Sequence, residues 1–503
     1  MQNIVLSTIN ARYTHTSIAL RYLFANLKEY KNSTLIKEFV LNQTPYEITE
    51  KILESNPKIV GLGIYIWNAL ETQKVIHVLK KVSPETIIVL GGPEVSHLPH
   101  RVNFDSADYI IQGEGDLAFY DLCNSIFKGD PPNGKLIQAA LPPIESIELP
   151  YKYFTDEDIK NRFVYVEASR GCPFKCEFCL SSIDKSVRNI DLDKLLVEFQ
   201  RLWDRGGRTF KFIDRTFNLN MKNTTRILDF FLEKKPPYLV HFEVVPDNFP
   251  EALRDKIKLF PHGSLQLEIG IQTFDEHTSE NISRKQNFEK TKDNLHFLEH
   301  ETNSHLHVDL IIGLPGETIG SFGNNLNLLA NLTNSEIQLG ILKKLSGTHI
   351  SRHDDNYGMV YSDLPPYEIL KNDLIPFTTM QKMKRLARFW DLTYNSGNFS
   401  KSIKMLWSDG KVYENFSAFS EWIFTQTEST WHISLERLSE LLFHYLTGEC
   451  ELSKEEVANA IALDVLRFRG RKIPASIREH VTELPEIGEA NLEGLTKRQI
   501  KRL

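Results

Sequence analysis

The chain has 503 residues, of which 41% are hydrophobic and 25% are charged, and its formal net charge is −7. This length predicts two to four domains, and the acidic balance gives no reason to expect nucleic acid as the main partner. The longest apolar runs are the length of strands, well short of the ~20 residues of a membrane span, so no membrane partner is expected. The opening residues lack a secretory signal, which favours a cytoplasmic protein.

Residues 1–130 alternate short apolar runs with helical stretches and form the first predicted domain. Strands are expected at NIVLST, TLIKEFVLN, KIVGLGIYIWN, TIIVLGGPEVS and DYIIQ, with helices at SIALRYLFANLKEY, ITEKILES and ETQKVIHVLKKV between them. That order predicts a doubly wound parallel sheet. Ligands of such sheets bind at the carboxyl ends of the strands.

Glycines gather at or near these strand ends. A glycine lets the backbone approach a ligand closely, but taken alone a tight turn between strand and helix is the simpler explanation. The glycines are Gly61, Gly63, Gly91, Gly92, Gly113 and Gly115.

The prolines of residues 131–157 predict an extended linker, and a second domain is expected over residues 158–375. Strands at FVYVEAS, TFKFID, LVHFEVV, LQLEIGIQT, HLHVDLIIGL and EIQLGIL alternate with amphipathic helices, which predicts a partial (β/α)6 barrel. Chemistry in such barrels lies at the carboxyl ends of the strands. Residues 376–503 predict an α-helical domain, with a basic, solvated tail at EGLTKRQIKRL.

Three cysteines follow the first barrel strand, in EASRGCPFKCEFCLSS. Cys172, Cys176 and Cys179 have the spacing C-x3-C-x2-C, so their thiolates can converge on one metal centre and leave one position open. A zinc site would need a further ligand, and no second C-x2-C pair follows. Five cysteines in 503 residues also argue against a disulfide framework.

The cysteine motif, with Phe178 before its last cysteine, resembles that of the radical S-adenosylmethionine (radical SAM) enzymes. The resemblance implies that Cys172, Cys176 and Cys179 hold a [4Fe-4S] cluster whose open iron binds S-adenosylmethionine. It further implies reductive cleavage to a 5′-deoxyadenosyl radical, with a one-electron donor such as flavodoxin or ferredoxin as partner.

The same resemblance implies contacts to S-adenosylmethionine at the strand ends. Asp214 takes the place of a residue that contacts its amino group, with a strand-end cap as the alternative. Glu243 would reach a ribose hydroxyl or the sulfonium region, or else form a structural salt bridge. Glu268 and Gln272 share one strand face and would bind the ribose. Arg284 matches an arginine that pairs with the carboxylate.

DLIIGLPGET and ILKKLSGTHI resemble two further elements of these barrels. Gly313 and Pro315 would shape a loop against the adenine, and Glu317 would cap the next helix. Leu342 would pack on the adenine or belong to the core.

The first domain, with GLGIYIWN, GGPEVS and IQGEGD, resembles the cobalamin-binding domain that precedes many radical SAM barrels. One departure is clear: the motif D-x-H-x-x-G becomes RYTHTSI, with Tyr13 and Ile18 replacing its aspartate and glycine, so His15 is not expected to ligate cobalt. The resemblance implies cobalamin binding by Gly61, Gly63, Gly91, Gly92, Ser96 and Gly113.

Three functional hypotheses follow. The first is a cobalamin-dependent radical SAM enzyme, most often a methyltransferase, acting on an unknown substrate. The second is a radical SAM enzyme whose first domain no longer binds cobalamin. The third is a non-catalytic metal-binding sensor, which the barrel elements disfavour because a sensor needs no clamps for ribose and carboxylate.

Overall fold

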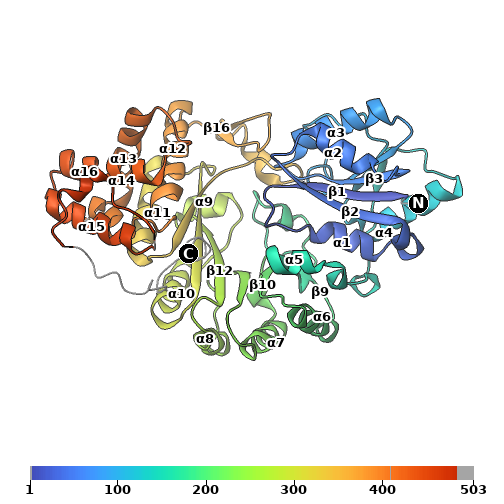
Figure 1. Ribbon diagram of the computed structural model, residues 1–503, viewed down its shortest axis with the longest axis horizontal. Coiled ribbons are helices and arrows are strands. Elements are labelled where there is room, and N and C mark those ends of the chain that lie inside the picture. The colour runs from blue at the N-terminus through green and yellow to red at the C-terminus, as the bar shows by residue number, and fades with distance from the viewer. Residues whose placement is uncertain (1–2, 408, 469, 484–503) are drawn as a thin grey trace. The chain divides into compact units, whose positions relative to one another are not determined.

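The computed structural model describes residues 3–407, 409–468 and 470–483 (Figure 1). It divides into two compact units. The first contains residues 1–244, 343–352 and 361–368, and the second contains residues 245–342, 353–360 and 369–503. The predicted tail EGLTKRQIKRL lies outside the described residues.

The first unit begins with a parallel sheet in the order β2-β1-β3-β4-β5-β6. The strand order reverses between β1 and β3, which is the switch point of a doubly wound sheet and the place where ligands bind. The predicted fold of the first domain is therefore confirmed. The strands are β1 (Ile4–Asn10), β2 (Thr34–Val40), β3 (Ile59–Gly63), β4 (Ile87–Gly91), β5 (Tyr109–Gln112) and β6 (Leu136–Gln138).

Helices cover both faces of this sheet. Ile52 and Leu79 belong to one apolar cluster with β3 and β4 residues, and Leu20 and Phe119 belong to a second cluster. The helix expected over residues 17–30 ends at Ala25 and is followed by a 3-10 segment. The helices are α1 (Ile18–Ala25), α2 (Pro45–Leu53), α3 (Ala69–Val82) and α4 (Gly115–Lys128).

The segment predicted as an extended linker is partly regular, which corrects that expectation. Leu136–Gln138 forms β6 and pairs in parallel with β5, and α5 (Asp156–Asn161) begins before the linker ends. A three-residue strand between prolines carries no visible alternation, and it forms because β5 offers an unpaired edge. The boundaries of the three predicted domains stay predictions.

Three barrel strands of the first unit are β7 (Val164–Val166), β10 (Thr209–Phe212) and β11 (Leu239–Val244), and β10 pairs in parallel with both others. Phe199, Phe210 and Phe231 pack as buried aromatic rings between these strands and their helices. Two short antiparallel strands, β8 (Ser169–Arg170) and β9 (Arg188–Asn189), flank the cysteines. The helices are α6 (Leu192–Asp204) and α7 (Met221–Leu232).

The other three predicted barrel strands lie in the second unit as β12 (Leu265–Gln272), β13 (His305–Ile312) and β14 (Glu336–Ile341), all parallel. Burial alternates along β13, because Leu306 and Val308 are buried while their neighbours are half-buried. The helices of this part are α8 (Glu251–Lys258), α9 (Glu276–Asn281), α10 (Phe288–Glu301) and α11 (Ile319–Leu332).

The C-terminal helices confirm the predicted α-helical region. Trp390 is fully buried against Phe416 and Trp407. No helix among the described residues has both the length and the apolar character needed to cross a bilayer. The elements are α12 (Phe377–Thr393), α13 (Val412–Thr427), α14 (Leu435–Gly448), α15 (Lys454–Leu466) and α16 (Ala475–Arg478), preceded by the short strands β15 (Val360–Tyr361) and β16 (Ile369–Lys371).

Candidate functional site

The three predicted metal-binding cysteines lie in one loop between β8 and β9, called here the cysteine loop. The Cys172 N–H donates to the Asp184 carbonyl (2.9 Å), and the Cys179 N–H donates to the Cys176 carbonyl (3.1 Å). Cys172 and Cys176 are buried, Cys179 is half-buried, and none of the three is in a disulfide. Three cysteines in one closed loop fit the donor set of an iron–sulfur cluster.

Asp214 braces the start of this loop from the end of β10. Its buried carboxylate accepts hydrogen bonds from the Ala168 N–H (2.9 Å) and from the Ser169 hydroxyl (2.6 Å). Burial raises the pKa of Asp214 to about 7, although these donors act in the opposite direction. The carboxylate therefore holds the strand end from which the cysteine loop begins, and its predicted contact with an amino group stays a prediction.

Arg170 joins the cysteine loop to the GEGD segment of the first domain. Its guanidinium donates to Glu114 (2.8 Å), Asp116 (2.9 Å) and Glu167 (2.9 Å), and it lies 4.7 Å from the centre of the Tyr22 ring. Burial raises the pKa of Glu167. The sequence pointed to the glycines of GEGD. In the structure, its two carboxylates, Glu114 and Asp116, bind Arg170 and so link this segment to the cysteine loop.

Arg188 on β9, at the other end of the cysteine loop, binds the same carboxylate of Glu114. It pairs with Glu114, and a second ion pair joins it to Asp184 (3.2 Å). Glu114 thus contacts the two arginines that flank the cysteine loop.

The predicted cofactor residues of the first domain line one cavity of about 480 Å³, called here the glycine cavity. A Cβ at Gly91 would meet no atom within 4 Å, so this residue borders open space. Leu180 and Ile183, which follow the last cysteine, line the same cavity. The predicted residues in its wall are Gly61, Gly63, Gly91, Gly92, Ser96 and Gly113.

The turn after β4 requires a glycine, and a serine links it to the turn after β5. Gly92 has a φ of +108°, and a Cβ there would lie 2.5 Å from the Ile64 carbonyl oxygen. The Ser96 hydroxyl donates to the Gly92 carbonyl (2.9 Å) and accepts from the Gly113 N–H (3.3 Å). Ser96 therefore ties together the turns that follow β4 and β5.

A second cavity of about 670 Å³ adjoins the glycine cavity, because Tyr65, Glu114 and Asp184 line both. The Tyr65 and Trp67 rings stack at 4.5 Å, and Arg170 also borders this space. Both volumes fall within the roughly 300–1,000 Å³ typical of ligand and cofactor sites. None of the three cysteines is among the described residues that line either cavity, although their neighbours are.

His15 lines the second cavity. Its Nδ1 lies 2.6 Å from the Tyr165 hydroxyl, and its ring packs 5.7 Å from that of Phe163. One ring nitrogen is thereby engaged within the protein. The expectation that His15 does not ligate cobalt stays a prediction.

Glu243 forms a salt bridge, which is one of the two alternatives that the sequence left open for this residue. Both of its carboxylate oxygens accept from Arg215 Nη1, at 2.7 and 2.8 Å. Its predicted contact with the ribose or sulfonium region stays a prediction.

In the second unit, Gln272 and Arg284 converge on the carboxyl end of β12. Arg284 donates to the Gly270 carbonyl and to Gln286 Oε1 (3.1 Å). Gln272 has a φ of +72°, where the register between β12 and β13 shifts. Glu268 lies two residues earlier than Gly270 on the same half-buried face.

The GLPGET loop of the second unit is shaped by its glycine and proline. Gly313 has a φ of +91°, and a Cβ there would lie 2.9 Å from Ile369. The Pro315 carbonyl accepts from Asn281 Nδ2 (3.0 Å). Leu342 is buried, as expected for a core residue.

The expected capping role of Glu317 is wrong. Thr318 caps α11 by accepting from the Ser321 N–H (3.0 Å), while Glu317 turns inward and is fully buried. It accepts from the Thr273 hydroxyl (3.0 Å) and from Asn325 Nδ2 (3.1 Å). Burial raises its pKa well above the usual range. These inward donors explain why the carboxyl group turns away from the helix end.

Comparison with known families places two domain types on this chain. Residues 4–123 match the model described as B12 binding domain, and residues 166–329 match the Radical SAM superfamily. Residues 355–496, which include the C-terminal helices, match a family described as Protein of unknown function (DUF4080).

Two curated relatives carry names that refer to methyl transfer. The chain is 26% identical over 239 residues to "Uncharacterized methyltransferase PH0819" of Pyrococcus horikoshii, covering 42% of this chain and 52% of the relative. It is 25% identical over 336 residues to "Cobalamin-dependent radical SAM methyltransferase TokK" of Streptomyces tokunonensis, covering 59% of this chain and 48% of the relative. The chain thus spans about half the length of these relatives.

Among solved structures, the cobalamin-dependent S-adenosylmethionine radical enzyme OxsB with aqua-cobalamin bound has a TM-score of 0.62. The match covers 95% of this chain and 80% of that chain at 13% identity. At this identity the likeness supports the fold, and it agrees with the predicted order of a doubly wound sheet, barrel strands and C-terminal helices.

Proposed function

We propose that this chain, which carries a B12-binding domain followed by a radical SAM domain, is a cobalamin-dependent radical SAM methyltransferase. The observation that carries the proposal is the glycine cavity, whose wall combines the predicted cobalamin residues with Leu180 and Ile183 of the cysteine loop. When bound, the cluster supplies the electron that cleaves S-adenosylmethionine and cobalamin carries the methyl group. The names of the two curated relatives support methyl transfer.

The residues present fit these cofactors. Cys172, Cys176 and Cys179 would hold the cluster, and the open space beside Gly91 would admit part of cobalamin. Asp214 and Arg170 would keep the cysteine loop in place beneath the bound groups.

In the second unit, Arg284 would bind the carboxylate of S-adenosylmethionine, because its guanidinium fork suits a carboxylate. Glu268 and Gln272 would bind the ribose, and Gly313 and Pro315 would border the adenine.

Reductive cleavage requires an external electron, so we assign a one-electron donor such as flavodoxin or ferredoxin as partner. We place the protein in the cytoplasm, because an iron–sulfur site held by cysteines requires reducing surroundings. The substrate that receives the methyl group is left unassigned.

The test is anaerobic reconstitution with iron, sulfide and hydroxocobalamin, followed by desalting, iron analysis and an optical spectrum. We expect about four iron atoms and near-stoichiometric cobalamin per chain, together with formation of 5′-deoxyadenosine from S-adenosylmethionine. Cys176→Ala should lose the iron and the cleavage activity but keep the cobalamin. Normal iron content and turnover in that variant would refute the assignment of the cysteines.

A second variant separates the two cofactors. Gly91→Leu should place its side chain in the glycine cavity, because a Cβ there meets no atom within 4 Å, and should abolish cobalamin retention while the iron remains. Gly448→Leu is the matched control, because a Cβ there also meets no atom within 4 Å. Normal cobalamin binding by Gly91→Leu would show that the glycine cavity is not the cobalamin site. Wild-type protein that holds the cluster but no cobalamin would instead favour a cobalamin-independent radical SAM enzyme.

A further inference from the structure

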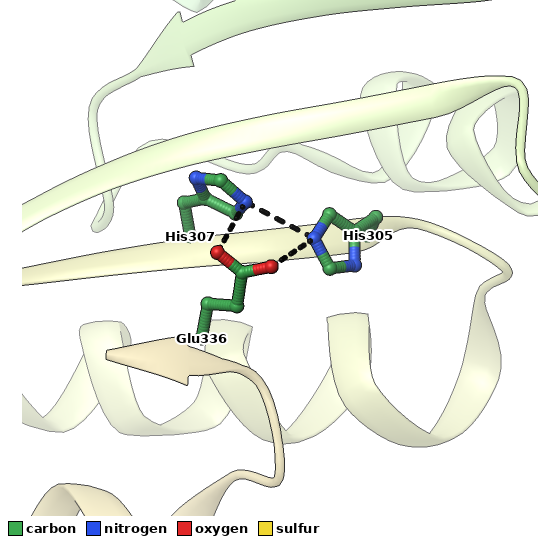
Figure 2. Close-up of side chains that lie close together, drawn as sticks. All are labelled: His305, His307 and Glu336. Carbon is green, nitrogen blue, oxygen red and sulfur yellow. Dashed lines mark hydrogen bonds and ion pairs between the residues drawn. The ribbon is translucent and has the colours of Figure 1, made fainter. Parts of the chain in front are cut away.

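Two histidines and a glutamate meet at the amino ends of β13 and β14, whereas the predicted cofactor residues lie toward the carboxyl ends. His305 and His307 belong to β13, and Glu336 is the first residue of β14. The strand register sets His307 directly beside Glu336, and alternation puts both histidines on the same face. Figure 2 shows the two imidazole rings and the carboxylate pointing toward one another. None of these three residues was predicted as a site residue from the sequence.

The spacing of the three groups is that of ligands around one ion. His307 Nε2 lies 3.0 Å from His305 Nε2 and 3.1 Å from Glu336 Oε2, and His305 Nε2 lies 3.4 Å from Glu336 Oε1. Ligand atoms that surround zinc tetrahedrally at about 2.0–2.1 Å are separated from one another by roughly 3.3 Å. The three atoms therefore occupy positions close to three corners of such a tetrahedron.

The hydrogen-bonding capacity of the cluster also favours a cation. His307 Nε2 faces Gln266 Nε2 (3.1 Å) in addition to His305 and Glu336. An imidazole nitrogen offers one proton or one lone pair, so it cannot satisfy three neighbours at this distance. A cation between the rings would accept the Nε2 lone pairs of both histidines and would also neutralise the Glu336 carboxylate.

The surroundings of the cluster suit a metal site as well. His307 Nδ1 lies 3.4 Å from the side-chain amide nitrogen of Gln338, and turning that amide over would give the ring N–H a carbonyl acceptor. The side chains of His305, His307 and Glu336 remain 23%, 19% and 12% exposed, which leaves a path for an ion.

We propose that His305, His307 and Glu336 form a binding site for one divalent transition-metal ion of the zinc type. Two imidazoles and one carboxylate are a ligand set that zinc uses with its fourth position open to water or a further ligand. Mg²⁺ should not compete, because it prefers oxygen ligands. The site shares no residue with the cysteine loop, and the proposal does not depend on the proposed function.

The test measures iron and zinc on the same samples. Reconstituted protein is dialysed against micromolar Zn²⁺, then against metal-free buffer, and both metals are quantified by mass spectrometry. Wild type and the control His444→Ala, which alters an exposed histidine of α14, should retain about one zinc per chain. The double variant His305→Ala/His307→Ala should lose this zinc and keep its iron. Zinc captured by cysteines would persist in the double variant, so only the difference between the proteins reports on this site.

A conservative variant keeps the proposal testable if the double variant folds poorly. Glu336→Gln preserves the size of the side chain but removes its charge, and should weaken zinc affinity at least about tenfold in competition with a chelating dye. Zn²⁺ should also raise the Tm of wild type more than that of this variant. Equal zinc content in wild type and the double variant, or unchanged affinity in Glu336→Gln, would overturn the proposal.

Discussion

The cysteine loop and the GLPGET loop both follow barrel strands, but different kinds of contact hold them. Around the cysteine loop, Arg170 joins three carboxylates from two segments of the first unit. Around the GLPGET loop, Glu317 is buried among uncharged donors, namely Thr273 and Asn325. Removing one partner of a buried ion network leaves charges without compensation, whereas a neutral network tolerates an uncharged replacement. The comparison therefore predicts unequal responses to mutation.

Arg170→Met should have the largest effect. It leaves Asp116 and Glu167 without their shared cation, while Glu114 keeps its ion pair with Arg188. Breaking a buried ion pair in this way costs about 3–5 kcal/mol. We expect a lower temperature for calorimetric unfolding of the first unit, together with loss of bound iron. Arg226→Met is the matched control, because Arg226 of α7 pairs with Asp193 of α6 (2.6 Å) with both side chains exposed, and such pairs contribute about 0–1 kcal/mol. Equal effects of the two variants would contradict the role given to Arg170.

Asp214→Asn should have an intermediate effect. The amide offers one acceptor oxygen and turns its NH2 group toward donors on Ala168 or Ser169, which should cost about 1–3 kcal/mol. Iron retention after reconstitution should fall, because the start of the cysteine loop loses its brace.

The same substitution should alter the dependence of stability on pH. The pKa of Asp214 is raised to about 7 in the folded protein from the model-compound value of 3.8. Between these values only the folded state retains the proton, so the free energy of unfolding falls as pH rises and levels off above pH 7. Wild type should therefore lose about 1–2 kcal/mol between pH 6 and pH 8 through this group. Denaturant titrations at both values should show a smaller loss in Asp214→Asn, and identical losses would mean that Asp214 does not titrate between pH 6 and pH 8.

Glu317→Gln should have the smallest effect. Burial raises its pKa well above the usual range, which favours the neutral acid, and an amide of the same shape can still accept from Thr273 and Asn325. We expect a change below about 1 kcal/mol in the free energy of unfolding. A loss as large as that of Arg170→Met would show that Glu317 is ionised and would remove the contrast between the two loops.

Much of the architecture was accessible from local sequence patterns. Every predicted strand of the first domain and of the barrel is a strand, because alternating apolar residues and glycine-bearing turns are encoded over a few neighbouring positions. The strand β6 was missed because it is short and depends on an edge supplied by β5. The inward turn of Glu317 was missed because its donors come from Thr273, just after β12, and from Asn325 of α11 rather than from its own loop.

The sequence by itself determined the cysteine spacing, the glycines at the strand ends and the order of the elements, since each depends on residues that are close along the chain. Only the tertiary structure decided which charged and metal-binding groups meet. Arg170 pairs with Glu114 from 56 positions away, and the register of β13 and β14 brings His307 beside Glu336. Such pairs follow from strand register and loop closure, which no local pattern specifies.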